Sequence, residues 1–376
     1  MITDKFPLDL QLEIKKVVNL LKPYTKRAYL VGGCVRDLLL NNKIKDLDIE
    51  VYDITPDEFD QLMQKNGALG VGKSFFVYKM GDIDLALPRI EKKVGVGHKA
   101  FEVELTDNEK IASKRRDFSM NAMMINIFTG ELLDFWGGQK SIEKKQISLI
   151  DEESFKEDSL RVLRAVQFSA RFGFEIEENS LEIMKNIDLS DLTKPRILWE
   201  FEKLFRADHL AVGFVYMYRL EVFEKLFTCK LKPKDIAKVT KELNEAVFVE
   251  ELRVYYFFYI VANICGFDPL EWLKKIEAPN HYLRVFKNQP FFKEKISNRE
   301  LLILAIDMPI CEWLGNYKDD VVVRAKKLGI YDNLFDGGVT IAQVIEDGFV
   351  KENIKIEYRR RVMEKLTYLC NYNIIT

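Results

Sequence analysis

Hydrophobic positions in the first 150 residues follow the spacing of helices in some segments and of strands in others. Leu8–Leu21 carries apolar residues three and four positions apart, which predicts an amphipathic helix. The apolar run Ala28–Val31 is followed by two glycines and predicts a strand that ends in a tight turn. Further strands are predicted at Leu47–Tyr52, Phe75–Met80, Ile83–Leu87 and Met123–Phe128, and further helices at Val35–Leu40 and Thr55–Lys65. The last of these helices begins with the residue pattern of a capping box.

The pattern changes after Asp151. Long stretches such as Ser159–Phe172 and Ile197–Phe205 follow helical spacing, and strand signals become rare. No Gly/Ser-rich linker separates the two parts of the chain. The sequence therefore predicts an α+β protein with a mixed head, followed by an all-helical remainder.

Composition limits the kind of protein that this chain can be. Its 376 residues are 48% hydrophobic and 31% charged, which suits a folded protein of two or three domains. Lys and Arg total 57 against 59 Asp and Glu, so the net charge of −2 excludes a strongly basic coat but not a local basic patch. The most apolar segment, Val254–Cys265, is too short to span a membrane.

The numbers of histidines and cysteines limit the kinds of metal site and the cellular compartment that the sequence allows. Three histidines argue against a metal cluster built from several imidazoles. The five cysteines are scattered, without a CxxC pair, and indicate reduced thiols in a cytoplasmic protein. Residues 1–10 carry early charges and no apolar core of signal-peptide length, which agrees with that location.

The strongest chemical signal is a pair of glycines followed by two spaced aspartates. Gly32 and Gly33 lie between a predicted strand and a predicted helix, where a backbone without Cβ atoms can approach phosphate oxygens. Arg36 would supply a forked cation for a triphosphate. Asp46 and Asp48 lie two residues apart on a strand and share one face, as carboxylates that hold Mg²⁺ together must. The alternative is a turn followed by two solvated acids.

A third carboxylate is expected if the chemistry is nucleotidyl transfer by two metal ions. Asp84 is the candidate, because it stands at the start of the predicted strand Ile83–Leu87, which could neighbour the strand that carries the pair. Asp82 is interpreted as a turn residue. An exposed strand end is the alternative reading of Asp84.

Arg116 and Asp117, in the run Arg115–Ala122, have the chemistry of nucleotide contacts. Adjacent arginines can bind phosphates, while Asp117 and Asn121 can hydrogen-bond to ribose hydroxyls. A charged loop before a strand is the commoner meaning of such a run.

Asp158 and Arg161 lie three residues apart on a predicted helix and therefore share a face, with Arg164 nearby. An aspartate accepts from the exocyclic amine of cytosine or adenine, and an arginine donates to the adjacent ring acceptor. Uracil and guanine present the opposite pattern and would be refused. An ordinary ion pair on a helix is the alternative.

Three other features are interpreted as structural. Gly67–Ser74 matches the P-loop pattern GxxxxGK[ST], but that loop needs a strand before it and a helix after it, and here the order is inverted. A P-loop ATP-binding protein is therefore the weaker alternative function. The basic segment Arg89–Ala100 is interpreted as a solvated loop, and the aromatic run Tyr255–Tyr259 as core.

The order of the motifs resembles one family. GGCVRD at 32–37, DLD at 46–48, RRDFSMNAM at 115–123 and EDSLRVLRAVQFSARFGF at 157–174 resemble the class II tRNA nucleotidyltransferases and bacterial poly(A) polymerases. The resemblance covers residues 26–205 and includes the segment Lys194–Phe205. It implies a polymerase-β-like nucleotidyltransferase palm in residues 1–145, a helical neck with the base-selecting motif in 146–205, and a helical body and tail that bind tRNA in 206–376.

The resemblance also implies the roles of individual residues. It places catalysis on Asp46, Asp48 and Asp84, with Mg²⁺ on the first two, and nucleotide contacts on Gly33, Arg36, Arg116, Asp117, Asn121, Asp158, Arg161 and Arg164. The implied enzyme adds CCA to tRNA 3′ ends from CTP and ATP and releases pyrophosphate, with the protein in place of a template. CC-adding enzymes, A-adding enzymes and poly(A) polymerases share these motifs and remain alternatives. The two aspartates argue against a non-enzymatic tRNA-binding module.

Three departures from the family pattern are visible. Gln167 stands where some members carry another arginine, so that nucleotide contact is not expected here. Ser141 replaces an acid that is often seen after the glycine pair at 137–138. His209 and His281 are the only histidines after residue 100, too few for the metal-dependent phosphohydrolase domain that some bacterial members carry.

Overall fold

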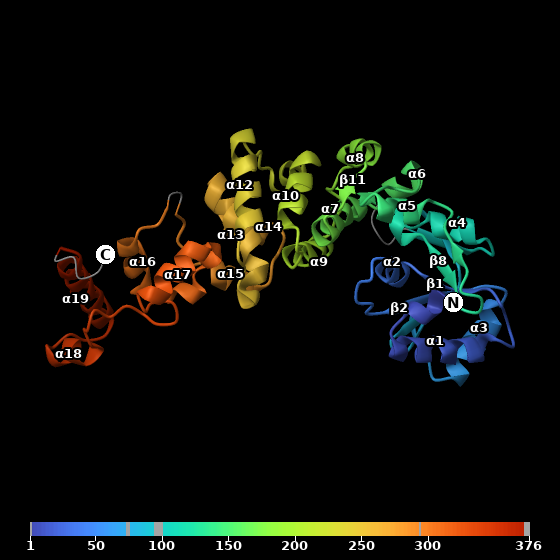
Figure 1. Ribbon diagram of the computed structural model, residues 1–376, viewed down its shortest axis with the longest axis horizontal. Helices are drawn as coiled ribbons and strands as arrows, with labels where there is room; N and C mark the ends of the chain where they lie inside the picture. Colours follow the sequence, from blue (N-terminus) through green and yellow to red (C-terminus); the bar gives the residue numbers. More distant parts are fainter. Residues whose placement is uncertain (1, 73–75, 94–100, 293–294, 372–376) are drawn as a thin grey trace. The chain divides into compact units, whose positions relative to one another are not determined.

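The computed structural model describes residues 2–72, 76–93, 101–292 and 295–371 (Figure 1). Its contacts divide the chain into two compact units. The first unit comprises Met1–Ile197 and Tyr216–Leu226, and the second comprises Leu198–Val215 and Phe227–Thr376. Within the described residues the first unit holds all the strands, and the second is helical. The structure therefore confirms an α+β chain, while the predicted three-part division at residues 145 and 205 stays a prediction.

A seven-stranded mixed sheet organises the described part of the first unit, in the order β3-β4-β5-β2-β1-β8-β9. Its strands are β1 (Ala28–Val31), β2 (Leu47–Val51), β3 (Leu69–Gly72), β4 (Val77–Met80), β5 (Ile83–Ala86), β8 (Met124–Asn126) and β9 (Leu132–Leu133). β2 and β5 are parallel, and the other neighbouring strands are antiparallel. Because β2 and β5 run side by side in one direction, their first residues meet at the same edge of the sheet.

Side-chain alternation along β2 separates the core from the site. Its odd-numbered apolar residues are buried in the core that includes α1 (Leu8–Leu21) and α3 (Pro56–Lys65). The even-numbered positions, Asp46, Asp48 and Glu50, lie on the opposite side. A shift of one residue in this strand would bury the acids and expose the core, so the apolar pattern fixes where the acids lie.

The start of α3 follows the predicted capping box. The Thr55 side chain accepts a hydrogen bond from the Glu58 backbone, and the Glu58 carboxylate accepts one from the Thr55 backbone. Pro56 occupies the first helical turn, where its missing N–H costs nothing. The helix is thereby fixed at its N-terminus before it packs on the sheet.

Two short elements connect strands of the sheet to the rest of the first unit. α2 (Gly33–Leu39) begins directly after β1, and the 3₁₀ turn η3 (Ser119–Asn121) precedes β8. Phe118, next to η3, contacts Phe155 and Phe168 with ring centroids 5.7 and 5.8 Å apart. These rings attach the helical part of the first unit to the sheet.

A small parallel strand pair lies beside α5 (Gly138–Glu143) and α7 (Leu160–Phe172) in the first unit. This pair consists of β10 (Gln146–Ile147) and β11 (Glu175–Ile176). The other helices of this unit are α4 (Glu109–Lys114), α6 (Glu152–Lys156) and α8 (Glu178–Lys185). Three further helices, α9 (Lys194–Phe205), α10 (Leu210–Arg219) and α11 (Val222–Phe227), have residues in both units.

The second unit is built around α13 (Arg253–Cys265). Tyr256, Phe257, Phe258 and Tyr259 are buried there, so most of the aromatic run is core, as predicted. The other helices are α12 (Pro233–Glu245), α14 (Pro269–Lys275), α15 (Asn280–Phe286), α16 (Asn298–Ala305), α17 (Asp319–Lys327), α18 (Ile341–Glu346) and α19 (Glu352–Asn371). No helix in the described part of the chain is both long and apolar enough to cross a membrane.

One predicted loop is wrong in part. Residues Arg89–Lys93, at the start of the segment interpreted as a solvated loop, form strand β6, which pairs with β7 (Phe101–Leu105). Phe101–Leu105 alternates between apolar and charged residues as a strand does, whereas the charged Arg89–Lys93 shows no such pattern and is stabilised by pairing with it. Residues 94–100 of that predicted loop lie outside the described residues.

Candidate active site

Three aspartates lie along one edge of the sheet, which we call the acidic edge (Asp46, Asp48 and Asp84). In the register of the parallel pair, Asp48 of β2 stands directly opposite Asp84 of β5. Asp46 comes immediately before β2. The predicted placement of Asp84 on a neighbouring strand is therefore confirmed.

The acidic edge is electrostatically strained. Partial burial raises the pKa of Asp48, and the nearby charges of Asp84, Asp46 and Glu50 raise it further, against the opposing charge of Arg116. One carboxylate oxygen of Asp84, Oδ1, is buried and has no hydrogen-bond partner among the described residues. Carboxylates that repel one another and lack donors attract a cation.

Glu50 lies on the same face of β2 as Asp48, but its pKa is lowered, whereas that of Asp48 is raised. It is 2% exposed and accepts hydrogen bonds of 2.9 Å from both Arg115 and Arg116. Although burial alone would raise the pKa of Glu50, the two guanidinium charges outweigh it and leave the pKa below its ordinary value. Glu50 therefore holds the two arginines beside the acidic edge.

Gly32 makes room for one of these arginines. It adopts φ of +74°, and a Cβ atom there would lie 2.9 Å from Nη1 of Arg116 and 3.7 Å from Oδ2 of Asp48. A side chain at this position would be strained and would displace Arg116. Gly33, the first residue of α2, follows at once. The structure thus brings Gly32, Arg116 and Asp48 together, as the order of the motifs suggests.

A second group of side chains forms a continuous set of hydrogen bonds, which we call the Arg36 network. Arg36 is 4% exposed; its Nε and Nη2 each donate to Asp37 at 2.9 Å, and its Nη1 donates to Asn121 at 2.6 Å. Asn121 in turn donates to Asp117 at 2.9 Å, and Arg164 donates to Asp117 at 2.8 Å. Although burial raises the pKa of Asp117, the Arg164 charge and these hydrogen bonds lower it overall.

The same network continues to the far end of α7. Arg171 donates to Asp37 at 3.2 Å, so α7 contributes both Arg164 and Arg171. These residues are seven apart and lie on one face of the helix. The network therefore ties α7 to α2 and to the segment around η3 at two points.

The structure does not pair the two predicted base-selecting residues with each other. Asp158 accepts hydrogen bonds of 3.0 and 2.9 Å from Arg196 at the start of α9. Arg161 donates to the backbone carbonyls of Ser154 and Arg115 at 2.6 Å. Asp158 also precedes α7, which begins at Leu160, so the prediction that it shares a helix with Arg161 is wrong, and the described residues show no ion pair between the two.

Sequence reasoning missed two of these functional neighbours. Glu50 follows the aspartate pair at the same two-residue spacing, and that spacing was the available signal. Arg196 lies in the last motif of the family resemblance, but only the folded chain shows its contact with Asp158, 38 residues earlier.

The residues present are compatible with a divalent cation. Among the described residues, no three His, Cys, Asp or Glu side chains are arranged to enclose a metal ion by themselves. The acidic edge instead offers hard oxygen donors and the unpartnered Oδ1 of Asp84. Such a set suits an ion that completes its shell with phosphate oxygens.

The P-loop pattern does not have the required surroundings. The helix α3 ends at Lys65, before the glycines, and residues 69–72 of the pattern form strand β3. Lys73 and Ser74 lie outside the described residues. A helix before the loop and a strand within it are the reverse of the phosphate-binding arrangement.

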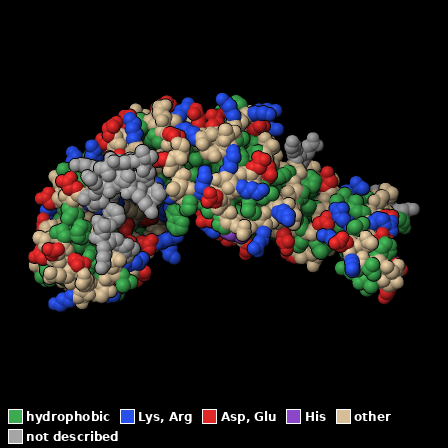
Figure 2. Space-filling model, turned by 180° about the vertical axis from the view of Figure 1, so that it is seen from behind, with side chains coloured by type: hydrophobic (Ala, Val, Ile, Leu, Met, Phe, Trp, Pro, Cys, Tyr) green, Lys and Arg blue, Asp and Glu red, His purple; other side chains and the backbone are tan. Residues whose placement is uncertain are grey.

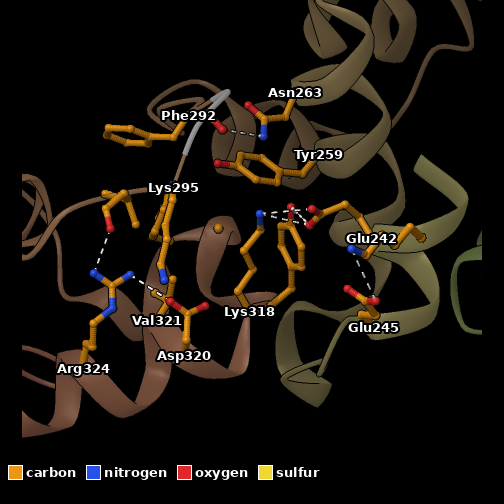
Figure 3. Close-up of a pocket in the computed structure, with 15 residues that line it drawn as sticks. Glu242, Glu245, Tyr259, Asn263, Phe292, Lys295, Lys318, Asp320, Val321 and Arg324 are labelled. Carbon is orange, nitrogen blue, oxygen red and sulfur yellow. Dashed lines mark hydrogen bonds and ion pairs between the residues drawn. The ribbon is translucent and has the colours of Figure 1, made fainter. Parts of the chain in front are cut away.

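A cavity of about 590 Å³ in the second unit is separate from this chemistry (Figure 3). Lys318 pairs with Glu242 at 3.1 Å and Arg324 pairs with Asp320 at 3.1 Å, so these charged groups along its wall are already neutralised. None of the predicted site residues lines it. We therefore place no chemistry there.

Comparison with known families agrees with this geometry. Residues 28–148 match the poly A polymerase head domain, and residues 173–230 match the family described as a probable RNA- and SrmB-binding site of polymerase A. The first match contains the acidic edge, and the second follows α7. Over these two regions the chain is similar to the class II tRNA nucleotidyltransferases and bacterial poly(A) polymerases.

Individual relatives of this nucleotidyltransferase family are moderately similar. A CCA-adding enzyme of Oceanobacillus iheyensis is 31% identical over 68% of this chain and 64% of its own length, so the match spans less than two thirds of that relative. Crystal structures of the Bacillus stearothermophilus CCA-adding enzyme with CTP and of the Thermotoga maritima enzyme with tRNA have TM-scores of 0.66 and 0.71. They are 20% and 22% identical and cover 98% and 97% of this chain and 98% and 93% of theirs, which establishes a shared fold. Nucleotidyltransferases of this family generally use a divalent metal ion.

Proposed function

We propose that this protein is a template-independent tRNA nucleotidyltransferase that adds C, C and A to tRNA 3′ ends from CTP and ATP and releases pyrophosphate. The observation that carries this proposal is the acidic edge, with Asp48 opposite Asp84 and Arg116 held beside them by Glu50. The CCA-adding names of its relatives support the choice of tRNA as substrate.

In this proposal Asp46, Asp48 and Asp84 hold Mg²⁺ together with the phosphates of the incoming nucleotide. When bound, the metal would promote ionisation of the RNA 3′-hydroxyl and stabilise the charge of the departing pyrophosphate. The open backbone at Gly32 and Gly33 admits the triphosphate, and Arg116 neutralises part of its charge. The chain's own contribution is to place opposite charges where the reaction moves charge.

We assign Arg36, Asp117 and Asn121 to the positioning of this site. All three are engaged in the Arg36 network, so direct contact of Arg36 with a triphosphate needs its hydrogen bonds to Asp37 and Asn121 to open. The network fixes α7, the helix that follows Asp158 and carries Arg161 and Arg164. A direct ribose contact from Asp117 stays a prediction.

Base choice is assigned to Asp158 and Arg161, assisted by Arg164. Asp158 accepts from Arg196, so contact of Asp158 with a base needs this ion pair to open or to be shared. Cytosine and adenine can both donate an amine to Asp158 and accept from Arg161, whereas uracil and guanine cannot. The same pair would thus select both nucleotides of the CCA sequence.

The second unit carries the part of the proposal that concerns the RNA partner. We assign residues 206–376 to tRNA binding in a cytoplasmic enzyme. Lys, Arg, Asp and Glu side chains are intermingled on the face shown in Figure 2, which agrees with the net charge of −2. Contact with RNA therefore depends on local basic groups rather than on a basic coat.

The experiment offers the purified protein tRNA without CCA, tRNA ending in CC, and an unrelated RNA. Each receives Mg²⁺ with CTP, ATP or both, and products are resolved at single-nucleotide length. Three nucleotides on the first tRNA and one on the second are expected, with none on the unrelated RNA. Addition of only C or only A identifies a partial enzyme, and long A tracts on any RNA identify a poly(A) polymerase; either result contradicts the proposal.

A further inference from the structure

Trp199 on α9 is an unusual surface residue. Its side chain is 63% exposed, whereas Trp272 and Trp313 in the same unit are 3% and 2% exposed. The buried face of this part of α9 includes Phe201, Leu204 and Phe205. Trp199 lies away from that face, so core packing does not explain a tryptophan here.

Two cations follow Trp199 along the same side of the chain. Lys203, four residues later, places Nζ 5.2 Å from the centroid of the Trp199 ring. An ion pair of 2.8 Å with Glu200, which is 2% exposed, holds that lysine in place. Arg206 is exposed one turn further on. Trp199, Lys203 and Arg206 form what we call the α9 patch.

Further rings lie beside the α9 patch. Tyr255 of α13 contacts His281 and Tyr282 of α15, with ring centroids 6.4 and 5.3 Å apart. Burial raises the pKa of Tyr255, and the charge of Arg206 opposes that rise, which places Arg206 near this ring. Tyr255 is half-buried and His281 is exposed, unlike the buried residues of the aromatic run. The aromatic surface therefore continues from α9 to α13 and α15.

The charged side chains on this surface are of both signs. Lys203 is paired with Glu200, Glu202 on the same side of α9 accepts a hydrogen bond from Tyr282 at 3.3 Å, and Arg206 contributes an exposed positive charge. An exposed aromatic ring flanked by cations is the arrangement with which proteins bind single-stranded nucleic acid without sequence preference. A protein partner would favour a broader apolar surface than one tryptophan among charges.

We propose that the α9 patch binds an unpaired segment of the RNA substrate, with one base stacked on Trp199 and phosphates near Lys203 and Arg206. The proposal rests on the proposed function for RNA as the substrate. The match of residues 173–230 to an RNA-binding family is consistent with it. It adds a specific contact, and it extends the surface to Tyr255 and His281, outside the matched region.

The test measures binding to the full chain without nucleotide, using tRNA that lacks CCA and a short single-stranded RNA. RNA is expected to quench the fluorescence of the wild-type protein, and Trp199→Phe is expected to lose most of that quenching while keeping its affinity within a few-fold. Trp199→Ala is expected to weaken binding about tenfold, the loss typical of one stacked base. Tyr24→Ala, which removes an exposed aromatic of the first unit, is the matched control and should bind normally.

The salt dependence of RNA binding by Arg206→Gln tests the same contact independently. Loss of one phosphate contact should reduce the slope of log affinity against log salt by about 0.7. Wild-type affinity in Trp199→Ala, or quenching that persists in Trp199→Phe, would overturn the proposal even if the protein adds nucleotides normally. So would a Trp199-dependent dimer in sedimentation. If these binding results hold but no nucleotide is added, the proposed function fails and the RNA contact stands.

Discussion

The acidic edge and the Arg36 network both contain aspartates, but those of the network have hydrogen-bond partners, whereas those of the edge repel one another. In the network, Asp37, Asp117 and Asn121 are each met by an arginine or an amide at hydrogen-bond distance. At the acidic edge, the charges of Asp46 and Asp84 help to raise the pKa of Asp48, and Oδ1 of Asp84 has no partner among the described residues. Polar groups whose hydrogen bonds are made within the protein can position a site, whereas groups that lack partners are candidates for binding a ligand.

The same contrast exists within one strand. Asp48 and Glu50 lie two residues apart on the same face of β2, yet the pKa of Asp48 is raised and that of Glu50 is lowered. The difference comes from Arg115 and Arg116, which both donate to Glu50. The substitutions below separate the two states, from the largest expected effect to the smallest.

Asp84→Asn should have the largest effect on activity. It removes a charge from the acidic edge, and we expect nucleotide addition to fall by about a thousandfold. Without metal, the variant should unfold at a higher temperature than the wild type, because one repelling carboxylate is gone. Single-turnover addition and thermal unfolding measure the two effects. A less stable variant with normal addition would contradict the assignment.

Arg36→Met should mainly reduce stability. It leaves Asp37 and Asn121 without their buried partner, and we expect a loss of about 3 kcal/mol in the free energy of unfolding. Nucleotide addition should fall as well, because Asp37 and Asn121 lose the side chain that links them, and α7 joins the network through these two residues. Urea unfolding provides the measurement, with the exposed Lys16→Met as control. Equal stability of the two variants would show that the network is not needed.

Glu50→Gln should change the dependence of stability on pH. Because the folded protein lowers the pKa of Glu50 below 4.5, its charge stabilises the fold above that pH and ceases to do so as the pH falls through the lowered value. The variant should be about 2 kcal/mol less stable at neutral pH. The difference from the wild type should shrink below pH 4.5. A constant difference across that range would contradict the lowered pKa.

Asp158→Asn should alter base choice without a large loss of activity. An amide at this position can donate to the O4 of uracil, so the preference for CTP over UTP in kcat/KM should fall about tenfold. Arg196→Gln is the matched control, because it breaks the ion pair and keeps the carboxylate. It should preserve the preference. A loss of preference in both variants would assign selection to the ion pair instead.

Lys73→Ala should have the smallest effect. The proposal gives no chemical role to the P-loop pattern, so nucleotide addition and ATP binding should stay near the wild-type values. Equilibrium binding of ATP to the variant checks this. Loss of ATP binding, with no loss in Asp84→Asn, would favour the P-loop function.

The sequence predicted elements and motif positions well where the signal is local. The helix Leu8–Leu21 and the strand Ala28–Val31 have the predicted bounds, and the Thr55 capping box is present. Each depends on residues within a few positions of one another. The pairing of Asp84 with Asp48 was also anticipated, because the apolar run after Asp84 already indicated a strand.

The missed features depend on residues that are distant in sequence. Glu50 could be recognised as a buried anchor only after Arg115 and Arg116, about 65 positions later, were placed beside it. Strand β6 is stabilised by its pairing with β7, and its charged sequence gave little sign of it. The burial of Arg36 depends likewise on Asn121, 85 residues later. Such contacts are products of the tertiary fold.

One measurement tests the central claim that the acidic edge transfers nucleotides to tRNA. Wild type, Asp48→Asn and the neighbouring turn variant Asp82→Asn are given tRNA without CCA, CTP, ATP and Mg²⁺, and tRNA binding is measured in parallel. The account predicts three-nucleotide addition by the wild type and by Asp82→Asn, and none by Asp48→Asn, with equal tRNA binding by all three. Normal addition by Asp48→Asn would contradict it.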